Sequence, residues 1–415
     1  MQTAAEKITR YLWLISFCGL ALFIPFSISG ANISIGFGFL GSIIAMIALP
    51  DARRRYLGLF KDPLFPAALL LVVSALPSVF MSENFSRARG DWESYWLLII
   101  YFFVAYNLTS LRLRRVVFWI LFASASISCL VSLVQYQGGV DAGFIHIAGE
   151  ARPASTLFIM TFAGILAQVI AVNFCVLFRR GRFGRLEGVM VAGLLLQAVG
   201  LFLTMARWAW VALFGGLVVG VLLLRRRGPL VAAAAILAVL VAFAATDDRV
   251  RRKAASIVQI VNGPTDVNVS TRFVLWDVSR ELFKQNPILG VGMGDYEIEA
   301  RKLIGERHVE TATDSHNVYL QILVTRGLVG FIPFLFFWFV LIRMLFKTRA
   351  ALAEHKGFAW HFVTGVIAAT VALLIGALTE NNIDDSEVFT TFLLLAGIAR
   401  SLELFPEPGR ADTDG

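Results

Sequence analysis

The residues best suited to chemistry surround His316, in the segment Asp314-Ser-His-Asn-Val-Tyr-Leu320. A neutral imidazole is a competent general base near pH 7. Asp314 and Ser315 are good N-cap residues, so the pattern predicts that His316 lies in the first turn of a helix, where the helix dipole favours the neutral ring. Asp314 and Asn317 are candidates for orienting the ring, and Asp314 could raise its pKa again. The alternative is a histidine that caps the helix or contacts lipid headgroups, and position alone favours neither.

Four arginines, Arg89, Arg152, Arg207 and Arg272, are candidate ligands for a phosphate group. The planar guanidinium fork matches phosphate oxygens and can hold two of them at once. Any single arginine is more often a solvated charge or a contact to lipid headgroups. Arg89, Arg207 and Arg272 taken as a set favour a functional role.

A glycine-rich stretch, Asn286-Pro-Ile-Leu-Gly-Val-Gly-Met-Gly294, lies between Arg272 and His316. It lacks the Lys-Ser/Thr pair of a nucleotide-binding loop, so we interpret it as an irregular turn that allows close backbone approach. The residues from Arg272 to Lys284 have helical spacing, and Asn286-Pro287 predicts the end of that helix. The sequence has no H-E-x-x-H, C-x-x-C or D-x-D motif, so we expect no metal and no cofactor.

The elements that position these residues are predicted to be membrane helices. Of the 415 residues, 58% are hydrophobic and only 16% are charged, against about 25% charged in soluble proteins. Apolar stretches long enough to span a bilayer predict an all-α polytopic membrane protein with about twelve transmembrane helices. They lie near 11–29, 32–50, 63–81, 94–109, 116–136, 157–178, 188–205, 208–224, 229–246, 317–346, 359–379 and 387–404.

Basic residues cluster in every second link between these stretches, which by the positive-inside rule predicts that those links and both termini are cytoplasmic. The net charge of +8 therefore reflects membrane topology rather than nucleic-acid binding. The predicted organisation is nine spans in 1–246, one large extracytoplasmic loop in 247–316, three spans in 317–404 and a cytoplasmic tail in 405–415.

The apolar stretch 188–224 contains Arg207 and has basic links on both flanks. Two cytoplasmic flanks require an even number of crossings, and the stretch is too long for one span. We therefore predict two helices joined by a tight turn at Ala206-Arg207-Trp208, with Arg207 on the same side as the large loop. The alternative is an intramembrane arginine that reaches the interface with its long side chain.

Several of these motifs together resemble the O-antigen ligase superfamily, which covers lipopolysaccharide O-antigen ligases, O-antigen polymerases and bacterial O-oligosaccharyltransferases. The matching residues are Arg272, Trp276, Phe283, the run from Asn286 to Tyr296, the run from His316 to Gln321, and the run from Arg326 to Gly330. The predicted span layout with one large loop extends the resemblance along the chain.

The resemblance implies a GT-C-like, inverting, metal-independent glycosyltransferase at the periplasmic face of a Gram-negative inner membrane. Its donor would be a glycan on undecaprenyl pyrophosphate, and the acceptor of a ligase would be a sugar hydroxyl of lipid A-core. His316 matches the family's general base, Arg272 the loop arginine and Arg207 the arginine of the turn. Arg152 matches a further arginine motif only loosely, because the usual Asn-Pro is missing.

Two alternatives remain open. An O-antigen polymerase would use the same donor with a growing chain as acceptor, and sequence separates it poorly from a ligase. A transporter or flippase with a gating loop would carry charged residues inside its spans, whereas most charges here lie in links.

Overall fold

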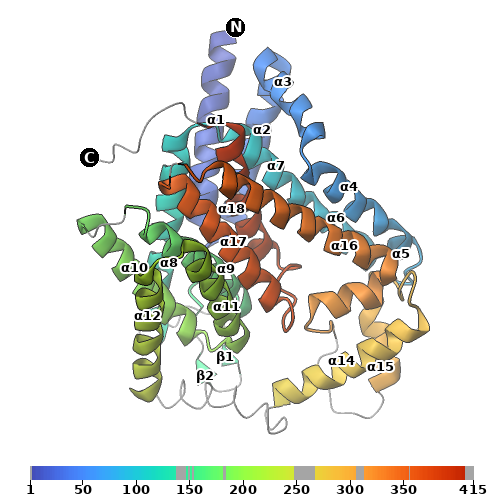
Figure 1. The fold of residues 1–415 in the computed structure, drawn as a ribbon. Helices are drawn as coiled ribbons and strands as arrows, with labels where there is room; N and C mark the ends of the chain where they lie inside the picture. The colour runs from blue at the N-terminus through green and yellow to red at the C-terminus, as the bar shows by residue number, and fades with distance from the viewer. Residues whose placement is uncertain are drawn as a thin grey trace.

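A computed structural model describes residues 2–136, 146–147, 150–151, 154–180, 184–246, 267–304, 313–354 and 356–406. These residues are almost entirely helical (Figure 1). The elements are α1 (Gln2–Phe23), α2 (Ile28–Ala48), α3 (Pro50–Leu57), η1 (Gly58–Lys61), α4 (Leu64–Ser74), α5 (Leu76–Phe80), α6 (Phe85–Glu93), η2 (Ser94–Leu97), α7 (Leu98–Asn107), α8 (Leu111–Tyr136), β1 (His146–Ile147), β2 (Glu150–Ala151), α9 (Ile159–Leu177), α10 (Arg185–Leu203), α11 (Arg207–Leu224), α12 (Arg227–Thr246), α14 (Val267–Gln285), α15 (Tyr296–Ile304), α16 (Val318–Ala351), α17 (Phe358–Gly376) and α18 (Ser386–Leu404).

The prediction of a polytopic helical membrane protein is confirmed in its coarse form. Within the described ranges, seven helices are long and apolar enough to cross a membrane, or up to eight if the bent pair Pro50–Lys61 and Leu64–Phe80 is one span. Each of the twelve apolar stretches is helical over most of its length, but the number twelve and the sidedness of the links stay predictions.

Helices α9, α11, α17 and α18 form the centre of the bundle. Nearly every residue of α9 is buried, as expected for a helix that is apolar all round. Small residues allow close packing: a β-carbon at Gly365 of α17 would lie 2.7 Å from the Val172 Cα of α9, and one at Gly216 of α11 would lie 2.7 Å from the Ala368 carbonyl oxygen. Such small-residue contacts are the usual way for membrane helices to approach one another.

The apolar stretch 188–224 folds as two helices, which confirms the predicted pair. The turn, however, lies at Thr204–Ala206 rather than at Ala206–Trp208, and Arg207 is the first residue of α11. Met205 adopts a left-handed conformation with φ of 54°. The Thr204 hydroxyl accepts a hydrogen bond from the Ala206 backbone N–H at 3.2 Å, which helps to close the turn.

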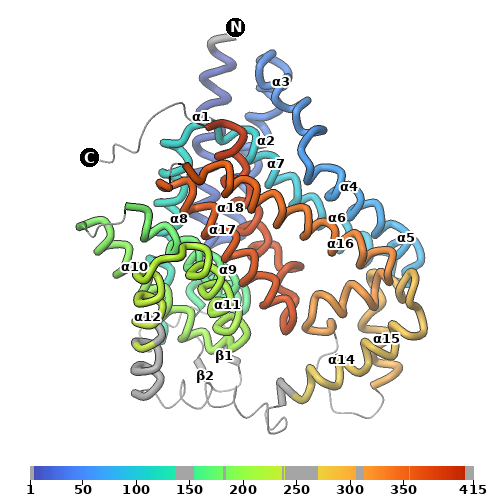
Figure 2. Tube along the Cα trace, viewed as in Figure 1, coloured from blue at the N-terminus to red at the C-terminus, as the bar shows by residue number. Residues whose placement is uncertain are grey.

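Helices α14 and α15 gather at the end of the bundle opposite the N-terminal half of α1 (Figure 2). The end of α14 and the irregular glycine turn after it are confirmed, whereas α15 was not predicted. The two helices share a small apolar core with Val324 of α16, formed by Leu275, Val278, Leu282, Tyr296, Ala300 and Ile304. This core fixes α14, and therefore Arg272, relative to α16.

Helix α16 is broken at Gly327, which has φ of 57° and ψ of −162°. The predicted span 317–346 is therefore not one continuous helix, because residues 318–326 precede the break. The glycine-rich turn supplies the missing hydrogen bonds of the broken helix. Val291 and Gly292 donate to the carbonyls of 324 and 325 at 2.8 and 3.2 Å, and the N–H groups of 328 and 329 donate to the carbonyls of 287 and 288 at 2.9 and 3.1 Å.

The same turn is attached to the α5–α6 link through Asp295, which is 2% exposed. Its carboxylate accepts hydrogen bonds from the Ser82 hydroxyl and the backbone N–H groups of Glu83 and Asn84 at 2.8–2.9 Å. A buried carboxylate requires such partners. The segment 287–295 therefore ties together three parts of the chain that are distant in sequence.

Replacing Gly327 by alanine should destabilise the protein. A β-carbon there would lie 2.2 Å from the Ile288 carbonyl oxygen, and the left-handed conformation alone costs a non-glycine residue about 1–3 kcal/mol. We expect Gly327→Ala to lower the midpoint of thermal unfolding in detergent.

The matched control is Gly36→Ala in α2, where an added β-carbon meets nothing within 4 Å. Alanine is the better helix former, so the midpoint of this variant should stay the same or rise. Equal midpoints for the two variants would contradict the role assigned to the break.

Candidate functional site

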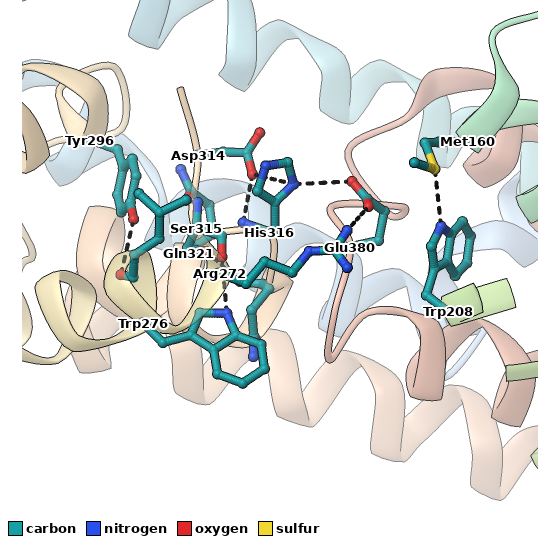
Figure 3. A network of polar contacts seen from close by, with 12 residues as sticks. Met160, Trp208, Arg272, Trp276, Tyr296, Asp314, Ser315, His316, Gln321 and Glu380 are labelled. Carbon is teal, nitrogen blue, oxygen red and sulfur yellow. Dashed lines mark hydrogen bonds and ion pairs between the residues drawn. The ribbon is translucent and has the colours of Figure 1, made fainter. Parts of the chain in front are cut away.

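The predicted site residues His316 and Arg272 are brought together by a residue that the sequence analysis did not single out, Glu380. One guanidinium nitrogen (Nη2) of Arg272 lies 2.8 Å from Glu380 Oε2, and His316 Nδ1 lies 3.3 Å from Glu380 Oε1. One carboxylate thus bridges the two side chains (Figure 3). The three come from separate elements: Arg272 from α14, His316 from the segment before α16, and Glu380 from the link between α17 and α18.

The local structure around His316 differs from the prediction. Asn317, and not Asp314 or Ser315, is the N-cap of α16, because its side chain accepts a hydrogen bond from the Leu320 N–H at 3.1 Å. His316 therefore lies before the helix, in a left-handed conformation with φ of 48°. Asn317 does not contact the ring but fixes the start of the helix.

Asp314 contacts His316 through the backbone and also lies close to the ring. Its carboxylate accepts a hydrogen bond from the His316 N–H at 2.7 Å and lies 3.5 Å from Nδ1. The Ser315 hydroxyl donates to the Asn317 carbonyl at 2.8 Å, and Gln321 Oε1 accepts from the Ser315 N–H at 2.9 Å. These contacts hold the left-handed residue, whose conformation is otherwise unfavourable for a side chain with a β-carbon.

Trp276 joins α14 to this segment. One turn after Arg272, its indole N–H donates to the Ser315 carbonyl at 3.1 Å, as Figure 3 shows. Ser279, also on α14, forms a hydrogen bond with the hydroxyl of Tyr296 on α15 at 2.9 Å. The position of Arg272 relative to His316 is therefore set by contacts on both sides of α14.

The electrostatics of the ring also differ from the prediction. The dipole argument favoured a neutral imidazole, but the hydrogen bond to Glu380 raises the pKa of His316 above 6.5, with burial opposing it and Asp314 adding to it. Burial raises the pKa of Glu380, yet the hydrogen bond to His316 and the charge of Arg272 outweigh this and leave that pKa below its ordinary value. A protonated imidazole is thus stabilised at this position.

The remaining arginines are placed as follows. The Trp208 ring, next to Arg207, packs against Gly376, where a β-carbon would lie 2.8 Å from it, so α11 begins beside the segment that leads to Glu380. Arg89 of α6 is exposed and pairs with Glu93 on its own helix at 2.6 Å. Arg152 lies outside the described residues. A role of these three in phosphate binding stays a prediction.

Glu380 was missed because it carries no motif. It is one of three acidic residues in the short link after an apolar span and is followed by Asn381-Asn382, with Asp384 and Asp385 further on. The sequence signal that could have indicated Glu380 is a carboxylate in a short link on the predicted outer side, because a general-base histidine is commonly oriented by an acidic partner. Asp384 and Asp385 carry the same signal, so it does not single out Glu380.

Among the described residues, no group of three or more His, Cys, Asp or Glu side chains is arranged to hold a metal ion. The groups that the structure brings together at the candidate site are an imidazole, a bridging carboxylate and a guanidinium. Together they can accept a proton and stabilise negative charge nearby.

Comparison with known families gives one match. Residues 192–335 match the family model of O-antigen ligase. The predicted resemblance is thereby confirmed, and the match includes Arg207, Arg272 and His316 but ends before Glu380. None of the curated proteins compared matches the chain. Together with the apolar helices, this match supports a membrane protein related to the proteins of O-antigen processing.

Replacing Glu380 by glutamine should lower the pKa of His316. The neutral amide removes the largest contribution that raises this pKa, so the ring should lose its proton at lower pH than in the wild type. NMR titration of the histidine rings measures the change, with the His316 signal assigned from a His316→Gln sample.

Asp314→Asn is the matched control. Asp314 is the more distant carboxylate, so its removal should lower the His316 pKa less. A larger decrease in Asp314→Asn than in Glu380→Gln would contradict the assignment of Glu380 as the main partner.

Proposed function

We propose that this protein acts as an O-antigen ligase, which transfers a polymerised glycan from undecaprenyl pyrophosphate to a sugar hydroxyl of lipid A-core at the periplasmic face. The observation that carries this proposal is the Glu380 carboxylate bridging His316 and Arg272. It joins a proton acceptor to a phosphate-binding group within one small site. Those are the two functions that this transfer needs.

His316 serves as the general base. The acceptor hydroxyl loses its proton to the imidazole as its oxygen attacks the anomeric carbon, and the bond from that carbon to the pyrophosphate oxygen breaks. Direct attack from the opposite side inverts the anomeric configuration. With Glu380 facing Nδ1, the Nε2 nitrogen is the one that accepts the proton, and the carboxylate stabilises the imidazolium that forms.

Arg272 stabilises the leaving pyrophosphate. Its side chain is 21% exposed, and its ion pair with Glu380 uses one guanidinium nitrogen. The other N–H groups of the guanidinium can donate to phosphate oxygens. Arginine can neutralise the growing negative charge without a metal. Arg207, Arg89 and Arg152 are further proposed ligands of the same pyrophosphate, with Arg207 best supported because α11 begins next to the Glu380 segment.

The proposed location is the Gram-negative inner membrane, with both termini cytoplasmic and the site periplasmic. The clusters of arginine in alternate links support it. The apolar helices would hold the polyprenyl chain of the donor, and α14 and α15 would lie against the sugars. No nucleotide or cofactor is required, because the activated bond arrives on the lipid carrier.

His316→Ala should reduce glycan transfer by about 10²–10⁴-fold, the usual contribution of a general base. Lipopolysaccharide gels and lipid-carrier analysis of a deletion strain complemented with wild type or variant measure this. Bare lipid A-core with long polymer left on the carrier, in both the deletion and the variant, is the expected result. Full transfer by a folded His316→Ala protein at normal levels would exclude the mechanism.

The same assay separates the ligase from the polymerase. If the deletion strain transfers single repeat units to lipid A-core, the chain is a polymerase and the acceptor assignment changes. A second assay separates an enzyme from a transporter by mixing purified wild-type protein with donor and acceptor. If the protein is a transporter, no glycan transfer will be detected in this mixture.

Arg272→Ala should lower the rate of transfer by about 10²-fold or more, as does removal of a group that stabilises transition-state charge. Arg280→Ala is the control, because Arg280 is on the same helix, is exposed and pairs with Asp277. Its activity should equal that of the wild type. Addition of EDTA should leave the rate of glycan transfer by each variant unchanged. Equal losses of transfer activity in Arg272→Ala and Arg280→Ala would contradict the role of Arg272.

A further inference from the structure

A polar cavity lies at the end of the bundle opposite His316. It has a volume of about 440 Å³ and is bordered by the N-terminal half of α1, the α2–α3 junction and the link between α7 and α8. In Figure 1 these elements are at the top, whereas α14 is at the bottom. The cavity is therefore separate from the candidate functional site, and the proposed ligase reaction does not use it.

Four charged side chains line this cavity: Glu6 and Arg10 from α1, and Asp51 and Arg55 from α3. Each acid precedes its arginine by four residues, the spacing at which helical ion pairs form. In the described part of the chain, no ion pair within 4 Å joins any of the four. The cavity thus presents two positive and two negative groups that are not neutralised by each other.

Further polar atoms in the cavity wall lack partners. Thr9 is 1% exposed, and its hydroxyl has no hydrogen-bond partner among the described residues. The same holds for Arg55 Nε, although the Arg55 guanidinium lies 5.7 Å from the centre of the Trp13 ring. A buried polar group without a partner costs free energy, which a ligand donating and accepting hydrogen bonds at this position would recover.

We propose that this cavity binds the headgroup of a zwitterionic phospholipid, one that carries a phosphate and a primary ammonium. Arg10 and Arg55 bind the phosphate, and Glu6 and Asp51 bind the ammonium. The balance of two charges of each sign matches a headgroup with no net charge better than an anionic one.

The surface beside the cavity favours a lipid over a soluble compound with the same headgroup. Leu14 of α1, Ile47 of α2 and Leu57 of α3 are 40%, 70% and 62% exposed. These three side chains belong to the helices that form the cavity, and they offer an apolar surface to the acyl chains of a lipid. Trp13 in the cavity wall is a residue type that gathers at membrane–water interfaces.

The test uses the full-length protein in nanodiscs made of phosphatidylcholine with increasing phosphatidylethanolamine or phosphatidylglycerol. Native mass spectrometry after release from the discs counts the bound lipids. We expect phosphatidylethanolamine to be retained in preference to phosphatidylglycerol. The double variant Arg10→Gln/Arg55→Gln should weaken its retention by about tenfold or more.

Two matched variants sharpen the result. Arg54→Gln changes a neighbouring exposed arginine that does not line the cavity, so retention should equal that of the wild type. Glu6→Gln/Asp51→Asn should abolish the preference for phosphatidylethanolamine while phosphatidylglycerol is still retained. Thermal unfolding of each variant identifies any variant that is not folded. If one double variant is not folded, the other double variant is compared with Arg54→Gln to test the lipid site.

Three outcomes would overturn the proposal. Equal retention of the two lipids by the wild type would exclude a zwitterionic site. Equal retention by Arg10→Gln/Arg55→Gln and Arg54→Gln would place the lipid elsewhere. Displacement of the lipid by free phosphoethanolamine at a matched concentration would assign the cavity to a soluble phosphate compound.

Discussion

The arrangement of the site depends on one break in a helix. At Gly327 the backbone of α16 leaves helical geometry, and the hydrogen-bonding groups on either side of the break must find partners elsewhere. Residues 287–292 provide these partners through four backbone hydrogen bonds. The same segment continues to Asp295, which is hydrogen-bonded to the α5–α6 link, so these contacts fix both α14 and the start of α16. Arg272 lies on α14, and His316 lies just before α16.

The balance of charge at the site depends on Glu380, whose single carboxylate contacts both Arg272 and His316. A guanidinium and an imidazolium close to one another would repel, and the carboxylate between them removes that repulsion. The carboxylate also orients the two side chains, because Arg272 contacts one of its oxygens and His316 contacts the other. The site therefore keeps a histidine near a permanent positive charge without driving its pKa downward. This differs from a histidine at a helix N-terminus, where the dipole favours the neutral form.

Most of the helical architecture could be predicted from the sequence because apolar length is a direct signal for helices in a membrane. The turn before Arg207 was predicted to within about two residues, since the basic flanks of the stretch required an even number of crossings. The helix end at Asn286-Pro287 followed from backbone chemistry. The N-cap was misplaced because Asp314, Ser315 and Asn317 are all good caps, and tertiary contacts of Ser315 and Asp314 decided among them.

The contacts between distant segments could not be predicted from one sequence. Nothing local to Gly327 indicates that its break is completed by residues 287–292, and nothing local to Glu380 indicates that it faces α14. Both depend on which helices become neighbours, a property of packing rather than of pattern. His316 and Arg272 were selected by residue type and resemblance, but their partner needed the fold.

The segment that matches the O-antigen ligase family ends at residue 335, whereas the carboxylate that neutralises Arg272 is at position 380. During synthesis the arginine and the histidine therefore leave the ribosome well before their shared counter-ion. The site becomes electrically complete only when α17 has been inserted and its following link has folded back onto α14. Assembly of the last two helices is thus also the step that brings the carboxylate to Arg272 and His316, so a chain truncated after the family segment would keep both side chains and lack the group that bridges them.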